Sequence, residues 1–460
     1  MSERIGNRLE PELRGLLRQC VQCGLCLPHC ATWLSSGNEV HSPRGRLLLL
    51  EEMLTVPDAT APGSTPTAPV EGSLPSPPAA FLSAFDQCIG CRACETACPS
   101  GVPFALLERG RQLAGSRVAG RPTAVPAFVM RRLDSVSLLA GLARLGVLGR
   151  RILAWFGGVR WRSRLGKRNP VAGSLLRLLG SMPRSPRSDQ ELRRLLDDLL
   201  ASASISDANP RETVDPVPAG REDRQVVFFG GCANAGLLSA SSRRLRTVLA
   251  ASGCLVENPA GQQCCGALAD HTNRPGRAAS LRRINRVVIG GVSRPETMIV
   301  AEAAGCSLAL KDQEAELGGR VVDAVELLAD LTLPPLAELP LTVVYHDPCH
   351  SRHGQGLIAE PRALLLRIPG LRLVEPDEAD VCCGSGGTWG LRYPELSEDL
   401  GLRKARNLLD TGADLVLTSN PGCLGQIQDG LAVLAPSLPV LPLTDLIWYA
   451  IDRAHSSVNA

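Results

Sequence analysis

Short runs of apolar and β-branched residues alternate with segments of helical periodicity throughout the second half of the chain. The runs lie at 226–229, 255–257, 297–300, 343–345, 373–375 and 415–418. Between them, apolar residues recur every three or four positions, as on one face of a helix, at 241–251, 278–289 and 396–409. Strands that alternate with helices in this way predict parallel α/β units.

The order of these runs repeats, which predicts two tandem α/β domains at 225–335 and 336–460. Each copy has a lone cysteine after its first run, a Cys-Cys-Gly motif after its second and another lone cysteine after its third. The interval from the first lone cysteine to the motif is 32 positions in one copy and 33 in the other. We therefore expect these cysteines at strand ends or in the loops just after them.

The N-terminal part of the chain predicts a mainly helical domain at 1–120. Helices are expected at 44–54 and 81–85. The segment 56–80 contains seven prolines and no aromatic residue. Because such a segment cannot bury enough surface to order itself, it is a predicted flexible insertion within this domain.

Residues 121–224 form a basic, leucine-rich region that is expected to be helical and to end in a linker. From 130 to 187 the chain carries thirteen Lys or Arg and one acid, Asp134, a local charge of +12, which leaves −9 for the rest of a chain whose net charge is +3. These helices are expected to pack on neighbouring domains with the arginines in solvent. A docking surface for a partner subunit or for anionic lipid headgroups is the alternative.

Composition narrows the class of protein. At 460 residues and 44% hydrophobic content, the chain is long enough for about three domains. Its net charge of +3 gives no indication of nucleic-acid binding. The N-terminus has no apolar secretory segment, and no run approaches the roughly 18 apolar residues of a membrane span. These features predict a soluble or peripheral protein of a reducing compartment, where clustered cysteines serve metal or redox chemistry rather than disulfides.

Eight cysteines form two copies of C-x2-C-x2-C-x3-C, a spacing that holds cuboidal iron–sulfur clusters. In proteins with two such clusters, the fourth cysteine of each copy ligates the other cluster. We therefore predict two [4Fe–4S] clusters, the first held by Cys20, Cys23, Cys26 and Cys98 and the second by Cys88, Cys91, Cys94 and Cys30. Zinc usually needs separated pairs of ligands and has no use for the third cysteine of each copy.

Each of the two repeated domains supplies four further thiolates. The sets are Cys232, Cys264, Cys265 and Cys306, and Cys349, Cys382, Cys383 and Cys423. Adjacent cysteines fit a polynuclear cluster better than one tetrahedral ion, so one further iron–sulfur cluster per domain is expected. One zinc ion per domain, or free thiols in one domain, are the alternatives. Cys254 stands outside both patterns, its counterpart in the repeat is Arg372, and a buried, inert thiol is expected there.

Histidines and glycines flank the cysteines of the second repeated domain. His346, His350 and His353 are expected to hydrogen-bond sulfur or backbone rather than to bind metal. The glycine run at 384–387 matches neither G-x-G-x-x-G nor a Walker motif. Close approach of the backbone to a cluster, with amides donating to sulfide, explains it better. No catalytic residue and no flavin, nicotinamide or nucleotide site is predicted in the chain.

In these motifs the chain resembles the glycolate oxidase iron–sulfur subunit family, which combines a two-cluster ferredoxin domain with two cysteine-rich CCG domains. The resemblance rests on CVQCGLCLPHC, HSPRGR, CIGCRACETACPSGV, GGCAN, QQCCGALADH, HDPCH, VCCGSGGTWGLRYPELS and SNPGC. Heterodisulfide reductase-type subunits place a further cysteine shortly after the last one, where this chain has Ala309 and Gln426. This difference favours plain electron transfer over disulfide cleavage.

The resemblance implies the electron-transfer subunit of a 2-hydroxy-acid oxidoreductase complex. FAD-containing partner subunits would oxidise glycolate to glyoxylate, and this chain would pass electrons to a quinone or another acceptor, in the cytoplasm or peripherally at the cytoplasmic face of the inner membrane. A basic surface such as Arg44, Arg46 or the region 130–187 would favour reduced, more negative clusters and acidic partners. A related D-lactate or glycerol-3-phosphate dehydrogenase, a heterodisulfide reductase-like subunit and a zinc-stabilised scaffold are the alternatives.

The expected fold class is α+β multidomain. It comprises a mainly helical ferredoxin-type domain with two [4Fe–4S] clusters, a basic helical region and two tandem α/β CCG domains.

Overall fold

The computed structural model describes residues 15–55, 79–108, 110–111, 182–203, 224–272, 274–317 and 319–458, together with four residues between 135 and 141. The predicted insertion, except for its last two residues, and most of the basic region at 121–224 lie outside the described residues. The chain divides into two compact units, Met1–Pro122 and Thr123–Ala460.

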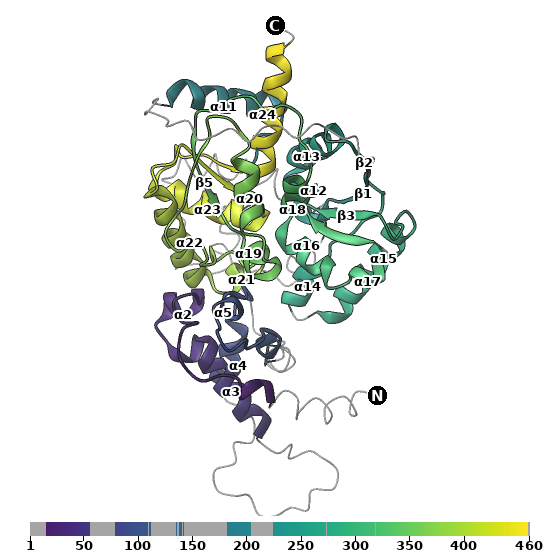
Figure 1. Ribbon diagram of the computed structural model, residues 1–460. Coiled ribbons are helices and arrows are strands. Elements are labelled where there is room, and N and C mark those ends of the chain that lie inside the picture. Colours follow the sequence, from purple (N-terminus) through teal and green to yellow (C-terminus); the bar gives the residue numbers. More distant parts are fainter. Residues whose placement is uncertain are drawn as a thin grey trace, which may run out of the picture. The chain divides into compact units, whose positions relative to one another are not determined.

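The first unit is built from short helices around an apolar core (Figure 1). Leu50, Phe85 and Leu106 are fully buried and belong to one cluster at its centre. Both helices predicted in this part of the chain are present. The elements are α2 (Ala31–Ser36), the 3-10 helix η1 (Glu39–His41), α3 (Pro43–Thr55), α4 (Ala79–Asp86) and α5 (Ala93–Thr96).

The two C-x2-C-x2-C-x3-C segments share an uncommon backbone conformation. In the first segment, Gln22 and Gly24 have φ values of 59° and 81°. Gly90 and Arg92, which occupy the same positions in the second segment, have φ values of 78° and 66°. Residues other than glycine rarely adopt this left-handed region. Each copy accepts one strained non-glycine residue, which indicates that the turn around the cysteines is a functional conformation.

The second unit contains two four-stranded parallel sheets with equivalent strand orders (Figure 1). The first sheet has the order β2-β1-β3-β4 and the second β6-β5-β7-β8. Six strands coincide with the predicted runs, whereas β4 and β8 were not predicted. The strands are β1 (Arg224–Phe229), β2 (Cys254–Glu257), β3 (Met298–Ala301), β4 (Arg320–Asp323), β5 (Thr342–His346), β6 (Arg372–Val374), β7 (Leu415–Thr418) and β8 (Val440–Pro442).

Helices connect successive strands in both domains, as parallel sheets require. In the first domain they are α12 (Gly231–Leu237), α13 (Ser239–Ala251), α14 (Ala267–His271), α15 (Pro275–Gly290), α16 (Ala304–Lys311), α17 (Glu314–Leu317) and α18 (Ala324–Asp330). In the second they are α19 (Cys349–Gln355), α20 (Ala359–Leu365), α21 (Trp389–Arg392), α22 (Pro394–Leu409), α23 (Pro421–Leu434) and α24 (Leu443–Val458). A further helix, α11 (Asp189–Ser202), precedes β1. The repeated order confirms the predicted tandem α/β units.

One apolar core joins the two sheets. Val226 of β1 and Val343 of β5 belong to the same buried cluster, to which α13, α20 and α24 also contribute. Successive side chains of a strand point to opposite faces of the sheet. Val227 and Val344 accordingly lie in two separate clusters, and each of these clusters contains cysteines of its own domain. The two α/β domains are therefore halves of one body.

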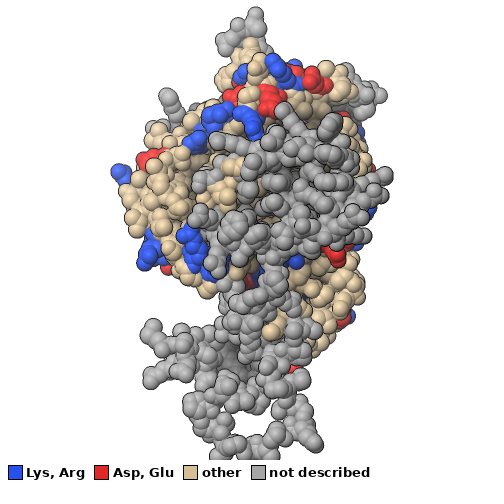
Figure 2. All heavy atoms as spheres, turned by 180° about the vertical axis from the view of Figure 1, so that it is seen from behind, with Lys and Arg blue, Asp and Glu red and all other residues tan. Residues whose placement is uncertain are grey.

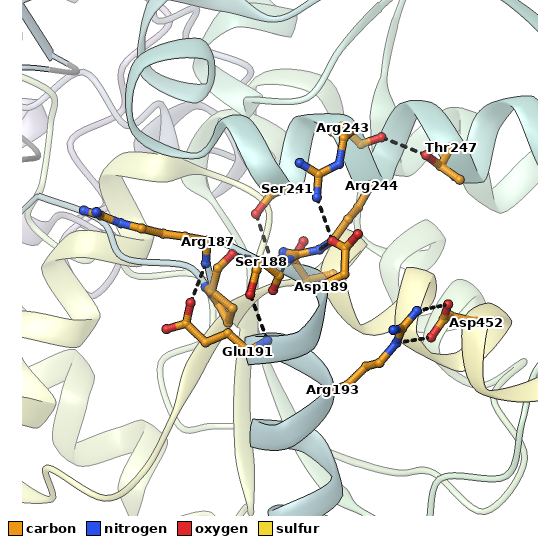
Figure 3. Close-up of polar contacts among 12 residues, drawn as sticks. Arg187, Ser188, Asp189, Glu191, Arg193, Ser241, Arg243, Arg244, Thr247 and Asp452 are labelled. Atoms are coloured by element: carbon orange, nitrogen blue, oxygen red, sulfur yellow. Dashed lines mark hydrogen bonds and ion pairs between the residues drawn. The ribbon is translucent and has the colours of Figure 1, made fainter. Parts of the chain in front are cut away.

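Polar contacts of α11 reinforce this union (Figure 3). Arg244 of α13 donates to Asp189 Oδ1 across 3.0 Å and to the Ser188 carbonyl across 2.8 Å. One turn further along α11, Arg193 forms an ion pair of 2.7 Å with Asp452 of α24. Helix α11 thus links the first α/β domain to the last helix of the second.

Charged side chains are spread over the described surface. In the face shown in Figure 2, Lys and Arg gather at several separate places, with Asp and Glu between some of them. The predicted basic surface at 130–187 falls almost entirely outside the described part of the chain. Within that described part, no helix has the length and apolar character that a membrane crossing requires.

Candidate metal centres

Cys30 lies beside three cysteines of the second C-x2-C-x2-C-x3-C segment. Burial, followed by the neighbouring sulfurs of Cys88 and Cys30, raises the pKa of Cys94 well above its usual range. A bound metal would remove this penalty by stabilising the thiolates. The cavity is lined by Cys30, Cys88, Cys91 and Cys94 and also by Thr32, Arg46, Phe104 and Leu107. Its four cysteines are the set that the spacing predicts for the second cluster.

Arg46 is buried beside this cavity. It is 1% exposed, its Nε donates to the Ala84 carbonyl across 2.7 Å, and its Nη2 donates to Thr32 Oγ1 across 3.0 Å. Its Nη1 lies 4.0 Å from Cys30 Sγ. The prediction that Arg46 forms part of a basic docking surface is therefore wrong, because the fold turns this side chain inward. A guanidinium in this position stabilises negative charge on the sulfurs.

The other four cysteines of the first unit are more accessible to solvent. Cys23 is exposed, and Cys20 and Cys98 are partly buried where they pack against the apolar core. Burial raises the pKa of Cys26 to about 11, with smaller contributions from the sulfurs of Cys30 and Cys20. The set predicted for the first cluster thus lies closer to solvent than the set predicted for the second.

The four cysteines of the first α/β domain form a continuous chain of thiols. Cys264 is hydrogen-bonded to Cys232 and to Cys265, and Cys265 is hydrogen-bonded to Cys306. These bonds from Cys232 and Cys265, with help from the Gly266 amide, lower the pKa of Cys264. These contacts alone therefore stabilise the thiolate form of Cys264, and the thiolate is the form that binds metal.

The second α/β domain repeats the arrangement. Cys382 is hydrogen-bonded to Cys349 and to Cys383, and Cys383 is hydrogen-bonded to Cys423. The amide of Ser385 donates to the Cys383 sulfur. Ser385 belongs to the glycine run, whose amides are predicted to donate to the sulfide of a cluster; that role stays a prediction. The contact with Cys382 and the burial of the site raise the pKa of Cys349 well above its usual range.

Strand topology explains why the cysteines of each domain meet. In each sheet the first and third strands of the domain lie side by side in the middle, so the direction of winding reverses between them. Ligands of open parallel sheets bind outside the carboxyl ends of the strands at this switch point. Cys232 and Cys306 follow β1 and β3, and Cys349 and Cys423 follow β5 and β7. Each Cys-Cys pair arrives in the loop after the neighbouring edge strand.

The two switch-point sites lie on neighbouring elements of the same body. Helix α16, which carries Cys306, packs against α19, which begins with Cys349. Between the two domains, the rings of His271 and His350 are 6.1 Å apart and inclined at 61°. Packed helices of the same body therefore connect the two sets of thiols.

His346 differs from the other histidines of the second domain. His353 Nε2 lies 2.8 Å from the Asp380 carbonyl oxygen, as expected for a hydrogen-bonding histidine. His346 is 1% exposed, and within the described residues neither of its ring nitrogens has a hydrogen-bond partner. A ring nitrogen, Cys383 Sγ and Cys423 Sγ all lie within 4.8 Å of one another. Burial lowers the pKa of His346 well below its usual range. The hydrogen-bonding role predicted for this residue is not realised.

Two buried polar side chains behind the Cys-Cys motifs were not predicted. Asn285 and Lys404 occupy the same position in α15 and α22, counted from the proline that begins each helix, and each is 1% exposed. Asn285 Nδ2 donates to the Cys264 carbonyl across 3.0 Å. Lys404 Nζ donates to the Glu378 carbonyl, and its charge acts on Cys383. Of these two equivalent positions, only the one in the second domain places a buried cation beside the sulfurs.

The donor sets fit soft metal centres. All sixteen predicted ligands are thiols, and in each α/β domain the four sulfurs form an unbroken series of contacts. Thiolates select iron–sulfur clusters and zinc, whereas calcium and magnesium require oxygen ligands. These sites can accordingly hold iron–sulfur clusters or zinc.

Family models match most of the segments that carry cysteines. A model described as a 4Fe-4S dicluster domain matches residues 16–102. A model described as a cysteine-rich domain, abbreviated CCG, matches twice, at 226–311 and 343–428. The second model therefore recognises both α/β domains.

Curated relatives extend the similarity to almost the whole chain. A probable glycolate oxidase iron–sulfur subunit of Bacillus subtilis is 30% identical and is aligned over 96% of both chains. The glycolate oxidase iron–sulfur subunit of Escherichia coli is 29% identical over 90% of both chains. A subunit of the anaerobic glycerol-3-phosphate dehydrogenase of Escherichia coli is 32% identical over 44% of this chain and 54% of its own length.

Proposed function

The chain belongs to the family of glycolate oxidase iron–sulfur subunits, and we propose on this basis that it is the electron-transfer subunit of a complex that oxidises glycolate to glyoxylate. FAD-containing partner subunits carry out the oxidation of the hydroxy acid in this proposal. The end-to-end alignment with the relatives from Bacillus subtilis and Escherichia coli supports it. A quinone or another acceptor receives the electrons.

The cavity shared by Cys30 and three cysteines of the other segment is the observation that carries this proposal. Cys30 is 58 positions from the nearest of them, yet all four line one cavity. Such crossing of ligands between two segments is typical of ferredoxin domains with two clusters. We assign Cys30, Cys88, Cys91 and Cys94 to one [4Fe–4S] cluster, and Cys20, Cys23, Cys26 and Cys98 to the other.

The residues around these thiols prepare the site for a one-electron carrier. An iron–sulfur cluster, when bound, supplies reversible one-electron chemistry. Arg46, held in place by Thr32 and by the Ala84 carbonyl, provides positive charge beside Cys30. The more exposed set, which includes Cys23, gives a partner protein access to the first cluster. Rigid placement of these groups reduces the rearrangement that accompanies a change of charge.

Each CCG domain holds one further metal centre in this proposal, either an iron–sulfur cluster or zinc. The unbroken contacts among its four sulfurs, at the switch point of its sheet, support this assignment. Contact between α16 and α19 brings the two centres into one body, as a relay requires. The proposed domain boundaries are 1–120, 121–224, 225–335 and 336–460.

The test is electron transfer by the chain prepared without oxygen. The purified protein should contain iron and acid-labile sulfide and should turn over no glycolate with an artificial dye by itself. Mixed with its flavoprotein partner subunits, it should be reduced by glycolate. D-lactate and glycerol 3-phosphate, offered to the same mixture, identify the substrate. Zinc without sulfide, or glycolate turnover by the isolated chain, would contradict the proposal.

Loss of a cluster should stop electron transfer through this chain without stopping the reduction of the partner's flavin by glycolate. With Cys94→Ser or Cys383→Ser, reduction of the flavin by glycolate should continue, while flow to the final acceptor should fall. Cys254→Ser is the matched control, because Cys254 is a buried thiol outside all four sets. Normal electron flow after both ferredoxin-type clusters are removed would contradict the relay.

A further inference from the structure

His346 stands at the centre of the second switch-point site. It is the last residue of β5, where it pairs in register with Thr418 of β7. The helices that follow these two strands, α19 and α23, carry Cys349 and Cys423 in their first turns. The side chain of His346 therefore lies at the carboxyl edge of the sheet, between the two segments that supply the lone cysteines of this domain.

The ring nitrogens of His346 make no hydrogen bond within the part of the chain that the structure describes. Both ring nitrogens are buried and lack a hydrogen-bond partner there. Buried polar side chains are normally paired, because an unpaired buried group lowers the stability of the fold. One ring nitrogen instead lies with Cys383 Sγ and Cys423 Sγ in a group whose members are within 4.8 Å of one another. This arrangement is suited to a metal ion or cluster that binds the imidazole nitrogen and both sulfurs.

The repeat indicates that the fold itself does not require an imidazole. Cys232 and Cys349 are equivalent, so the residue three positions earlier in the first domain, Phe229, corresponds to His346. Phe229 ends β1 as His346 ends β5, and both are 1% exposed. The first sheet fills this position with a purely apolar ring. The imidazole is therefore specific to the chemistry of the second site.

We propose that His346 is a nitrogen ligand of the metal centre held by Cys383 and Cys423, so that the second CCG site has mixed sulfur and nitrogen donors while the first has sulfur alone. This inference rests on metal binding by the CCG domains, as proposed above. With metal–sulfur bonds of about 2.3 Å and metal–nitrogen bonds of about 2.0–2.1 Å, tetrahedral donors lie roughly 3.5–3.8 Å apart. The observed group needs to contract by only about 1 Å.

The two sites also differ in a buried charge. Each site supplies four thiols, and the imidazole that His346 adds is neutral, so its ligation leaves the charge of the second centre unchanged. The nearby buried Lys404 compensates negative charge on the sulfurs, whereas its counterpart in the first domain is the neutral Asn285. This positive charge makes an iron–sulfur cluster in the second site easier to reduce than one in the first.

The test is direct detection of a bond between the metal and a ring nitrogen of His346. The whole chain is prepared without oxygen with 15N-labelled histidine. If the centre is an iron–sulfur cluster, pulsed electron paramagnetic resonance of the reduced protein should detect a directly bonded 15N. If it is zinc, X-ray absorption at the zinc edge should detect one nitrogen beside the sulfurs. His346→Phe, which copies the first domain, should abolish the nitrogen signal and weaken metal binding at this site by about 100-fold.

Control variants separate ligation from a structural role. His353→Gln should keep the nitrogen signal, because His353 bonds the Asp380 carbonyl. His346→Cys should restore metal binding without the nitrogen signal, since a thiolate replaces the imidazole. A wild-type protein without the nitrogen signal, or a His346→Phe variant that keeps it, would overturn the inference. The wild-type measurement decides the matter even where a variant fails to fold.

The outcome is independent of the relay. Reduction of the chain by glycolate and the partner flavoprotein, without a nitrogen signal, would leave the proposed function standing and remove this inference. Conversely, a zinc centre with one nitrogen ligand, in a chain that transfers no electrons, would support this inference and contradict the proposed function.

Discussion

Arg244 Nη1 donates a hydrogen bond to Asp445 Oδ2 across 3.1 Å, with exposed fractions of 1% and 0% for the two side chains. Arg244 belongs to α13 of the first CCG domain, and Asp445 belongs to α24 of the second. Ser185 and Ser241 also donate to Asp445 Oδ2, across 2.6 Å and 3.0 Å. The ring of Trp448 lies 5.4 Å from the guanidinium. A buried ion pair thus joins the two domains in addition to their shared apolar core.

Removal of one partner from this pair should destabilise the whole second unit. We expect Asp445→Ala to lower the free energy of unfolding by about 1.5–3 kcal/mol, because Arg244 keeps only the more exposed Asp189 as an ionic partner and two buried serines lose their acceptor. Asp452→Ala is the control, since Asp452 pairs with the half-exposed Arg193 and its loss should cost less than about 1 kcal/mol. Urea unfolding without oxygen measures both. Equal effects would contradict a structural role for the buried pair.

The sequence predicts the strands that precede a cysteine better than those that do not. Six strands could be predicted because the repeat in the sequence and the cysteine pattern mark their positions. The strands β4 and β8 have four and three residues and precede no cysteine, so neither signal applied to them. The repeat does hold a signal for them, since Val322 and Leu441 occupy equivalent places beside β3 and β7.

Side chains that act on the metal sites from a distance could not be predicted in the same way. The cysteines are recognisable by their spacing, whereas Arg46 has the sequence context of a surface residue and is directed inward only by the packing of α3. Lys404 and Asn285 likewise lie on buried faces of long helices, far in sequence from the sulfurs. Their influence arises from tertiary contacts, which periodicity and spacing do not encode.

Glu302 should make the stability of the protein depend on pH. This carboxyl is 6% exposed, and burial raises its pKa to about 7, although Ser242 donates to it across 2.6 Å. Between the unfolded pKa near 4.5 and the folded value, the folded state holds a proton that the unfolded state has lost. This contribution to stability is complete below the unfolded pKa and disappears as the pH rises through about 7.

The variant Glu302→Gln isolates this effect. Between about pH 5.5 and 7, the free energy of unfolding of the wild type should fall relative to that of the variant by about 1.4 kcal/mol per pH unit. The comparison of the two proteins cancels the acid sensitivity of the metal centres, which both share. A constant difference across this range would show that Glu302 is ionised in the folded protein.

Arg46 should raise the reduction potential of the cluster assigned to Cys30, Cys88, Cys91 and Cys94. Removal of its charge in Arg46→Met should lower that potential by on the order of 100 mV, given a charge about 4 Å from a ligand sulfur and an effective dielectric constant of about 20. Arg46→Lys should retain most of the potential. Arg44→Met is the matched control, since Arg44 is more exposed and pairs with Glu39. Redox titration followed by electron paramagnetic resonance would contradict the assignment if the two methionine variants shifted equally.

The crossing of ligands between the two segments makes the sharpest prediction for the first unit. If Cys30 and Cys91 bind the same cluster, Cys30→Ser and Cys91→Ser should remove the same spectroscopic signal, although 61 positions separate the two residues. Cys23→Ser should remove the other signal, because Cys23 belongs to the more exposed set. Electron paramagnetic resonance of the reduced variants, with iron analysis, distinguishes these losses. Removal of different clusters by Cys30→Ser and Cys91→Ser would mean that each segment binds its own cluster, and the shared cavity would then need another explanation.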